Sequence, residues 1–147
     1  MTNPLIGRST EIALLKSLLA SSKSEFVAVY GRRRVGKTFL IRRAFEQGFV
    51  FQVTGLANAN AEQQLLNFHI ALEKMGAHVS EKPAENWLYA FLHLSNHLEK
   101  MGEGKKIIFI DELPWFDTKG SGFIQALEHF WNSWASKEKK LVVVICG

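Results

Sequence analysis

The stretch Gly31–Thr38, which reads Gly-Arg-Arg-Arg-Val-Gly-Lys-Thr, matches the pattern G-x-x-x-x-G-K-[ST] at every fixed position. An apolar run, Phe26–Tyr30, precedes it, and a helical pattern begins at Phe39. The pattern indicates a phosphate-binding loop when a strand comes before it and a helix after it, and both are expected here. The stretch therefore predicts a nucleoside triphosphate as ligand.

The residue types of this stretch suit a dense anion. Backbone N–H groups curled around a phosphate, together with the dipole of the following helix, attract negative charge. Gly31 and Gly36 permit backbone angles and a close approach that a Cβ would forbid. We expect Lys37 to place its charge on the β- and γ-phosphate oxygens and the Thr38 hydroxyl to bind Mg²⁺. The nucleotide-binding residues predicted in this region are Gly31, Arg32, Arg33, Arg34, Val35, Gly36, Lys37, Thr38 and Phe39.

Length and composition indicate a globular protein. A chain of 147 residues with 47% hydrophobic and 22% charged residues is most simply one domain. The net charge of +4 allows contact with nucleic acid but does not require it. No apolar run approaches the ~20 residues of a membrane span, and the N-terminus lacks the pattern of a signal peptide. The single cysteine, Cys146, cannot form an internal disulfide, so we expect a cytoplasmic protein.

Apolar runs alternate with helical patterns along the whole chain. Strands are expected at 26–30, 49–54, 107–110 and 141–146, and helices at 11–20, 39–47, 61–75, 87–101 and 123–136. This alternation predicts an α/β fold with a parallel sheet and right-handed crossovers. The continuous apolar run at 26–30 predicts a strand that is buried on both faces.

Two acids follow the third expected strand. Asp111 and Glu112 come directly after Ile107–Ile110, at the edge where open α/β sheets bind their ligands. An acid at the end of a buried strand is costly unless something pairs with it. We expect Asp111 to hold Mg²⁺ through water, beside Thr38, and Glu112 to orient or deprotonate the water that attacks the γ-phosphate. The catalytic roles would then belong to Glu112 and Lys37, although a strand that simply ends in a solvated acidic turn is the alternative.

The position of Glu112 also separates classes of nucleotide-binding protein. A base beside the attacking water is typical of hydrolysis, whereas a small-molecule kinase transfers the phosphate to a bound acceptor. A GTPase would need a guanine-reading segment such as Asn-Lys-x-Asp, and this sequence has none. The favoured hypothesis is a Mg²⁺-dependent ATPase that binds ATP and ADP. The alternatives are an ATP-binding regulatory switch or DNA-associated adaptor with little turnover, and, less favoured, a small-molecule kinase.

Four stretches resemble the prokaryotic archaeal-type ATPases of the AAA/STAND-like P-loop group. These stretches are Leu5–Arg8 with Glu11, Tyr30–Thr38, Ile108–Trp115 and Val143–Gly147. The resemblance implies a three-layer P-loop NTPase core of the additional-strand, catalytic-Glu type. The sheet order of that core is 5-1-4-3-2, and this sequence supplies strands 1 to 4. The resemblance also places Ile6, Gly7 and Arg8 beside the adenine, although a turn before a helix, with Arg8 paired to Glu11, is the alternative.

The resemblance carries expectations about domain organisation. Residues 1–147 are expected to form an ATPase domain truncated at its C-terminus, in which 1–24 are the Gly-Arg segment and its helix. Hydrolysis would drive a conformational change in regions beyond Gly147, and nucleic acid would bind through those regions. The piece alone could bind ATP without efficient turnover. A first strand without its outer neighbour would expose an apolar edge, so self-association is a further expectation.

Overall fold

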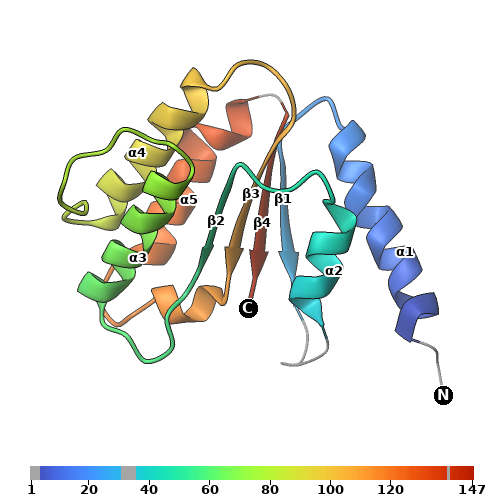
Figure 1. Cartoon of the computed structure of the whole chain (residues 1–147), viewed down its shortest axis with the longest axis horizontal. Helices are drawn as coiled ribbons and strands as arrows, with labels where there is room; N and C mark the ends of the chain where they lie inside the picture. Colours follow the sequence, from blue (N-terminus) through green and yellow to red (C-terminus); the bar gives the residue numbers. More distant parts are fainter. Residues whose placement is uncertain (1–3, 31–35, 139) are drawn as a thin grey trace.

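The computed structural model describes residues 4–30, 36–138 and 140–147, with the side chains described from residue 10 onward. These residues form a four-stranded parallel sheet with helices on both faces (Figure 1). In chain order the elements are α1 (Pro4–Ser17), η1 (Leu18–Ala20), β1 (Glu25–Val29), α2 (Lys37–Ala44), β2 (Phe51–Thr54), α3 (Ala61–Lys74), α4 (Trp87–Lys100), β3 (Lys106–Asp111), η2 (Leu113–Phe116), α5 (Phe123–Ser133), η3 (Ala135–Lys137) and β4 (Leu141–Cys146).

The strands lie in the order β1-β4-β3-β2, and each neighbouring pair is parallel. This is the order predicted for strands 1 to 4, and the α/β fold class with a parallel sheet is confirmed. The register pairs Thr54 with Asp111 and Val29 with Cys146. Because the strands are parallel, their carboxyl ends meet at one edge of the sheet. The chain ends there, close to the start of α2 (Figure 1).

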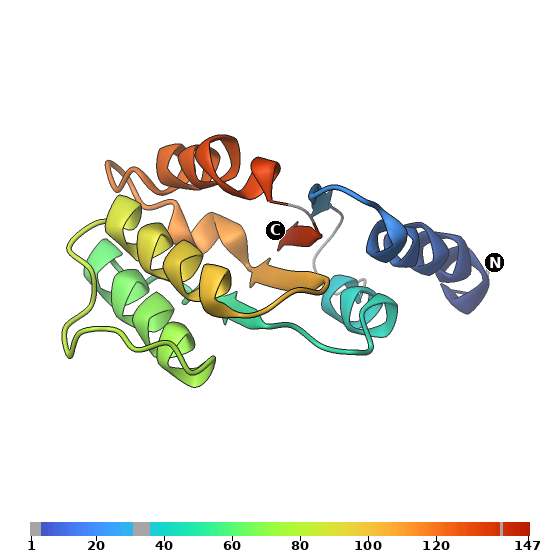
Figure 2. The same ribbon diagram turned by 90° about the horizontal axis from the view of Figure 1, so that it is seen from above.

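The three layers follow from the two-residue period of the strands. Figure 2 shows α1 and α2 on one side of the sheet and α3, α4 and α5 on the other. In β3, Ile108 and Ile110 belong to the core under α3–α5, whereas Ile107 and Phe109 belong to the core under α1 and α2. The near-continuous apolar sequence of β3 is therefore explained by burial on both faces.

Local sequence explains where two of the helices begin. The Asn60 side chain accepts a hydrogen bond from the Gln63 N–H at the start of α3, and the Gln63 side chain accepts one from the Asn60 N–H. This capping box satisfies N–H groups that the helix itself leaves without partners. At the start of α4, the Asn86 side chain accepts a hydrogen bond from the Tyr89 N–H.

The edge strand β1 differs from the prediction. The run at 26–30 predicted burial on both faces, but Phe26 is 38% exposed and the other residues of β1 are only partly buried. The reason is the position of the strand: among the described residues, β1 pairs with β4 alone. Trp131 of α5 covers part of the edge, with its ring centroid 5.3 Å from that of Phe26 in an edge-to-face contact.

The first helix also begins earlier than predicted. Helical periodicity indicated a start at Glu11, but α1 begins at Pro4. Proline is well suited to the first turn of a helix because its fixed φ is already helical and its missing N–H costs nothing there. The segment Leu5–Arg8 is therefore helical backbone, and the alternative of a turn before the helix is wrong.

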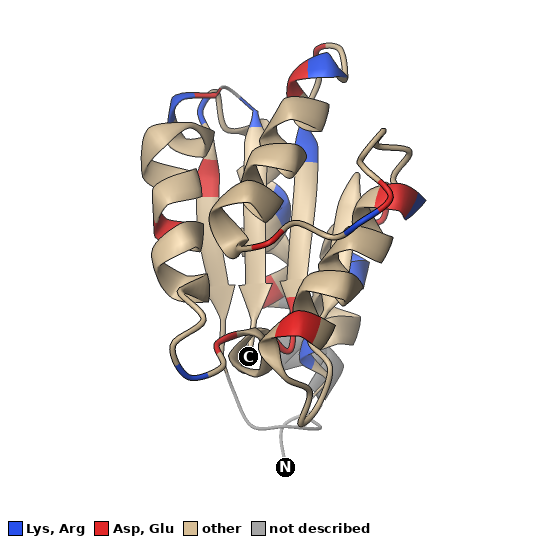
Figure 3. Ribbon diagram, turned by 90° about the vertical axis from the view of Figure 1, so that its left-hand side faces the viewer, with Lys and Arg blue, Asp and Glu red and all other residues tan. Residues whose placement is uncertain are grey.

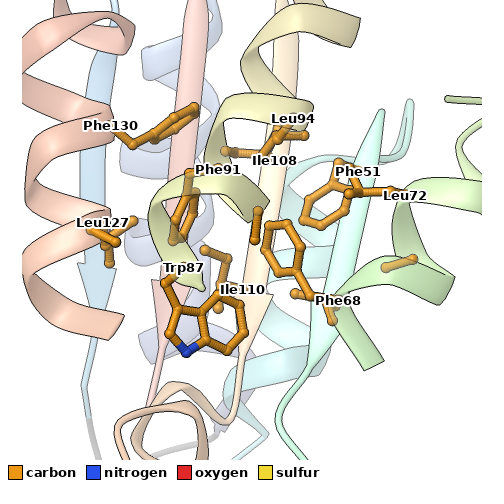
Figure 4. Packing of buried hydrophobic residues seen from close by; sticks show 14 of the residues in the cluster. Phe51, Phe68, Leu72, Trp87, Phe91, Leu94, Ile108, Ile110, Leu127 and Phe130 are labelled. Atoms are coloured by element: carbon orange, nitrogen blue, oxygen red, sulfur yellow. The ribbon is translucent and has the colours of Figure 1, made fainter. Parts of the chain in front are cut away.

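The larger core is built around aromatic side chains of α3, α4 and α5 (Figure 4). Trp87 lies at its centre, with its ring centroid 4.8 Å from that of Phe123 and 5.4 Å from that of Phe68, both in edge-to-face contacts. Such pairs add about 0.5–1.5 kcal/mol each beyond the burial of their apolar area. This core holds α3 and α4 firmly against β2 and β3.

A pair of leucines on α4 tests this packing. Leu94 is fully buried in the larger core, whereas Leu92 is 47% exposed on the outer side of the same helix. We expect Leu94→Ala to lower the free energy of unfolding by about 2–5 kcal/mol, because it removes buried surface and leaves a cavity. Leu92→Ala should cost less than about 1 kcal/mol. Urea unfolding of both variants measures the difference, and equal losses would contradict the assigned core.

Candidate functional site

The structure brings the end of the glycine-rich motif, 36–38, together with the acidic pair at the carboxyl edge of the sheet. The Thr38 hydroxyl, in the first turn of α2, donates a hydrogen bond to Asp111 Oδ2 at 2.9 Å. Asp111 is the last residue of β3 and is 8% exposed. Its other carboxylate oxygen, Oδ1, accepts a hydrogen bond from the Glu112 N–H at 2.8 Å. A side-chain hydrogen bond therefore joins Thr38 to Asp111, which lies 73 positions later in the chain.

Lys37 lies at the same edge. Its Nζ donates a hydrogen bond to the main-chain oxygen of Gly147, the residue directly after β4. Gly36, which precedes α2, has φ 75° and ψ 31°, in the left-handed region. Glycine adopts this conformation without steric cost, which explains a glycine at this position of the motif. The start of α2 thus faces the ends of both β3 and β4.

Glu112 has an unusual backbone conformation. Its φ is 52° and its ψ is 43°, a left-handed conformation that few residues other than glycine adopt. The conformation turns the chain out of β3 and into η2, whose Trp115 N–H donates a hydrogen bond to the Glu112 carbonyl at 3.1 Å. Such strain costs of order 1–3 kcal/mol and persists only where the surroundings enforce it. The half-buried Glu112 is therefore held beside Asp111 by its backbone.

Sequence reasoning missed Gly55, which follows β2. Its N–H donates a hydrogen bond to the Asp111 carbonyl at 2.9 Å. A Cβ at this position would lie 2.5 Å from the Glu112 carbonyl oxygen and 2.9 Å from Trp115 Cβ. In the sequence Gly55 resembles an ordinary loop glycine after a strand. Only the pairing of β2 with β3 shows that it packs against the acidic pair.

Cys146 is buried at this edge, in agreement with its interpretation as a core thiol. Burial raises the pKa of Cys146 from 9.0 to about 11, and the charge of Asp111 and a hydrogen bond to its side chain add to the rise. The positive charge of Lys37 acts in the opposite direction. The thiol is thus close enough to respond to both Asp111 and Lys37.

The raised pKa of Cys146 leads to two predictions, one about the reactivity of the thiol and one about the pH dependence of stability. At pH 8 the folded protein should carry roughly 100-fold less thiolate than an unperturbed cysteine, because its pKa is about two units higher, so alkylation by iodoacetamide should be slow until the protein unfolds. Because the folded pKa exceeds the unfolded one, the stabilisation from the neutral thiol is complete below pH 9. It should be lost as the pH rises from about 9 to 11.

The measurement compares wild type with Cys146→Ala. The difference in their free energies of unfolding should shrink between pH 9 and pH 11, whereas lysine and tyrosine titrations affect both proteins alike. A difference that stays constant across this range, or fast alkylation of the folded protein at pH 8, would contradict the burial of the thiol beside Asp111.

The donor atoms at the edge suit a magnesium ion. Thr38 and Asp111 offer oxygen atoms, which Mg²⁺ prefers, and this ion usually takes only one or two carboxylates and fills its other positions with water and phosphate oxygens. Within residues 4–30, 36–138 and 140–147 no group of three or more His, Cys, Asp or Glu side chains could hold a metal ion. Thr38 and Asp111 would leave the remaining positions around such an ion to water and phosphate oxygens.

Part of the predicted site lies outside the described residues. Gly31, Arg32, Arg33, Arg34 and Val35 belong to that part. Ile6, Gly7 and Arg8 are in α1, but their side chains are also outside the description, so their contact with the base stays a prediction. Phe39 is described and is exposed on α2.

Two further features bear on the choice of ligand. A cavity of about 460 Å³ lies between α4 and α5, and no described residue of either motif lines it. On the face shown in Figure 3, lysine and arginine residues are interspersed with acids and do not gather in one area.

Among the described helices, none has the length and apolar character needed to cross a membrane.

Comparison with known proteins gives one positive result. The sequence model of a family described as an ATPase domain predominantly from Archaea matches residues 5–147. The search of curated proteins found no match. The matched range contains Gly31–Thr38, Asp111, Glu112 and all four strands of the sheet.

Proposed function

This chain belongs to the family of ATPase domains that come predominantly from Archaea, and on that premise we propose that it binds Mg·ATP at the edge formed by α2, β3 and β4 and hydrolyses it. The observation that carries the proposal is the 2.9 Å hydrogen bond between Thr38 and Asp111. It joins the end of the glycine-rich segment to the acid that ends β3. These are the two halves that an ATP site needs.

We assign the phosphate contacts to the segment Gly31–Thr38. Its backbone N–H groups would surround the β-phosphate, and the N-terminus of α2 would add its dipole. The Lys37 ammonium group would move from the Gly147 carbonyl to the β- and γ-phosphate oxygens. In the same proposal Phe39 borders the nucleotide, and Ile6, Gly7 and Arg8 of α1 border the adenine.

The metal would be held by Thr38 directly and by Asp111 through water. An Mg²⁺ ion held by these residues would supply positive charge that neutralises the charge developing on the phosphate oxygens. The Asp111 carboxylate is already held by hydrogen bonds that include one from Thr38 and one from the Glu112 N–H. A carboxylate that is held in place spends little free energy on reorganisation when the ion arrives.

Glu112 would act as the general base. Its carboxylate orients a water molecule and accepts one of its protons while the water oxygen bonds to the γ-phosphorus. The bond from that phosphorus to the bridging oxygen of ADP breaks, and the products are ADP and phosphate. The left-handed backbone of Glu112 supports this role, because strained residues that the surrounding structure enforces are concentrated at functional sites.

The Lys37 contact also suggests how the change from ATP to ADP could alter the conformation of other parts of the molecule. The Lys37 Nζ contacts the main chain directly after β4, so a shift of Lys37 toward phosphate would break a contact with that segment. We propose that hydrolysis is coupled in this way to a conformational change beyond the site.

Calorimetry and a phosphate-release assay test the proposal. We expect the protein to bind ATP in the presence of Mg²⁺ more tightly than GTP, and to release phosphate without an added acceptor. Binding without any release would favour the regulatory switch, and release only in the presence of a small-molecule acceptor would favour the kinase. Failure to bind ATP would contradict the proposal as a whole.

A further inference from the structure

We propose that the loop between β2 and α3, residues 55–60, positions Glu112. In this proposal Gly55 packs against the Glu112 backbone, and Gln64 holds the loop in place through its hydrogen bonds to Leu56. The inference rests on the catalytic role proposed for Glu112. Neither residue belongs to a recognisable sequence motif. Both are identified by contacts that form only in the folded chain.

Gly55 packs directly against the backbone of Glu112. An added Cβ would lie 2.5 Å from the Glu112 carbonyl oxygen, 2.9 Å from Trp115 Cβ and 3.3 Å from the Phe116 ring. Real Cβ atoms do not approach other atoms as closely as the first two distances. The φ of Gly55 lies outside the left-handed region, so the position requires glycine for space and not for its backbone angles.

Gly55 and Asp111 confine Glu112 from two sides. The Gly55 N–H donates a hydrogen bond to the Asp111 carbonyl, the group immediately before Glu112 in the chain. The Glu112 N–H is held by Asp111 Oδ1, and the Glu112 carbonyl lies against Gly55. The end of β2 thus enforces the left-handed conformation of Glu112, and in our proposal this backbone conformation sets the direction of the Glu112 side chain.

Gln64 fixes the loop that carries Gly55. Its side chain is fully buried, and it makes two hydrogen bonds with Leu56: Oε1 accepts from the Leu56 N–H at 3.0 Å, and Nε2 donates to the Leu56 carbonyl at 2.7 Å. The Leu56 side chain is itself exposed, so burial of this leucine does not hold the loop. On the other side of Gly55, the Asn67 amide donates to the Thr54 carbonyl at 2.6 Å.

These contacts connect α3 to Glu112. Gln64 and Asn67 both lie on α3, and they hold the main chain immediately after and immediately before Gly55. A displacement of α3 would therefore move the Glu112 backbone. Gly55 and Gln64 are accordingly positioning residues, since they act through Glu112.

The main test is Gly55→Ala in the whole chain, with Gly102→Ala as the matched control. Gly102 has no atom within 4 Å of an added Cβ, and its φ is also outside the left-handed region. In Gly55→Ala we expect the backbone amide NMR signals of Glu112 and Trp115 to shift, with ATP affinity unchanged and kcat roughly 100-fold lower, because a displacement of about 1 Å can cost that much. Gly102→Ala should change none of these quantities.

A second variant covers the case in which Gly55→Ala does not fold. Gln64→Met preserves the size of the side chain but removes both hydrogen bonds to Leu56, and Gln125→Met, at an exposed position on α5, is its control. We expect Gln64→Met to shift the same two amide signals and to lower kcat about tenfold at unchanged KM. A general loss of structure would instead move signals throughout the protein.

The outcomes separate this inference from the proposed function. Absence of ATP binding or hydrolysis in wild type would contradict the proposed function, and the amide signals would still decide whether Gly55 and Gln64 hold Glu112. If those signals move no more in Gly55→Ala and Gln64→Met than in the controls, the inference is overturned. It is equally overturned if wild type hydrolyses ATP and both variants keep its kcat.

Discussion

Replacing Lys37 with alanine is expected to lower ATP affinity by roughly 100-fold or more, because it removes the cation that faces the triphosphate. Removing one partner of a desolvated charge pair typically costs about 2–5 kcal/mol, and about 1.4 kcal/mol corresponds to a factor of ten. In the structure the Lys37 ammonium group donates a hydrogen bond to the main-chain oxygen of Gly147, and in the proposed complex it turns from there to the phosphates. Calorimetric titration with Mg·ATP measures the change.

The control for this variant is Lys74→Ala. Lys74 is exposed in the last turn of α3, on an element that carries no phosphate contact in the proposal. Its replacement removes the same charge from the protein and should leave ATP affinity within about a factor of two. Equal affinities of wild type and Lys37→Ala for ATP would refute the assignment of the site.

Glu112→Gln is expected to preserve ATP binding and to lower kcat by about 10²–10⁴-fold, which is the usual contribution of a general base. Glutamine has nearly the same shape as glutamate, but its amide accepts a proton far less readily. The left-handed backbone should be retained, because it is enforced by the contacts of Gly55 and Asp111 with the main chain. Phosphate release and calorimetry on the same sample separate the two effects.

Glu103→Gln provides the comparison for Glu112→Gln. Glu103 is exposed in the segment between α4 and β3, at the opposite edge of the sheet from Asp111. The change in net charge is the same, and neither binding nor turnover should respond. If Glu112→Gln keeps the wild-type rate, another group must activate the water.

The sequence predicted the parallel arrangement of the strands, because alternating strand and helix patterns favour a parallel sheet with right-handed crossovers. The order of the strands was implied by the resemblance to the archaeal-type ATPases and not by this alternation. The sequence also predicted that Thr38 and Asp111 would meet. Asp111 is the last residue of β3, and Thr38 lies in the first turn of α2, the helix that follows β1. In a parallel sheet the ends of the strands and the starts of the helices that follow them lie at one edge, so these two residues meet. These features depend on residue type and spacing, which local sequence contains.

Other features depend on contacts between distant segments. The exposure of Phe26 follows from the place of β1 at the edge of the described sheet, which an apolar run cannot reveal. The start of α1 at Pro4 was missed because Leu5–Arg8 carries too little periodicity to identify a helix. A glycine after a strand and a glutamine on a helix are common, and nothing local distinguishes Gly55 or Gln64.

The residues of this chain, taken alone, predicted a parallel α/β sheet with Thr38 of the glycine-rich motif and the acidic pair at the same edge. Side-chain chemistry and hydrophobic periodicity are properties of neighbouring residues, so they can be identified from the sequence without the structure. The tertiary structure alone decided how Glu112 is held, through the close approach of Gly55 and the two hydrogen bonds of Gln64. The contact of Gly55 with Glu112 joins residues that are far apart in the chain, and it exists only once β2 pairs with β3. The Gln64 hydrogen bonds join residues eight positions apart, and they form only once the loop after β2 lies against α3.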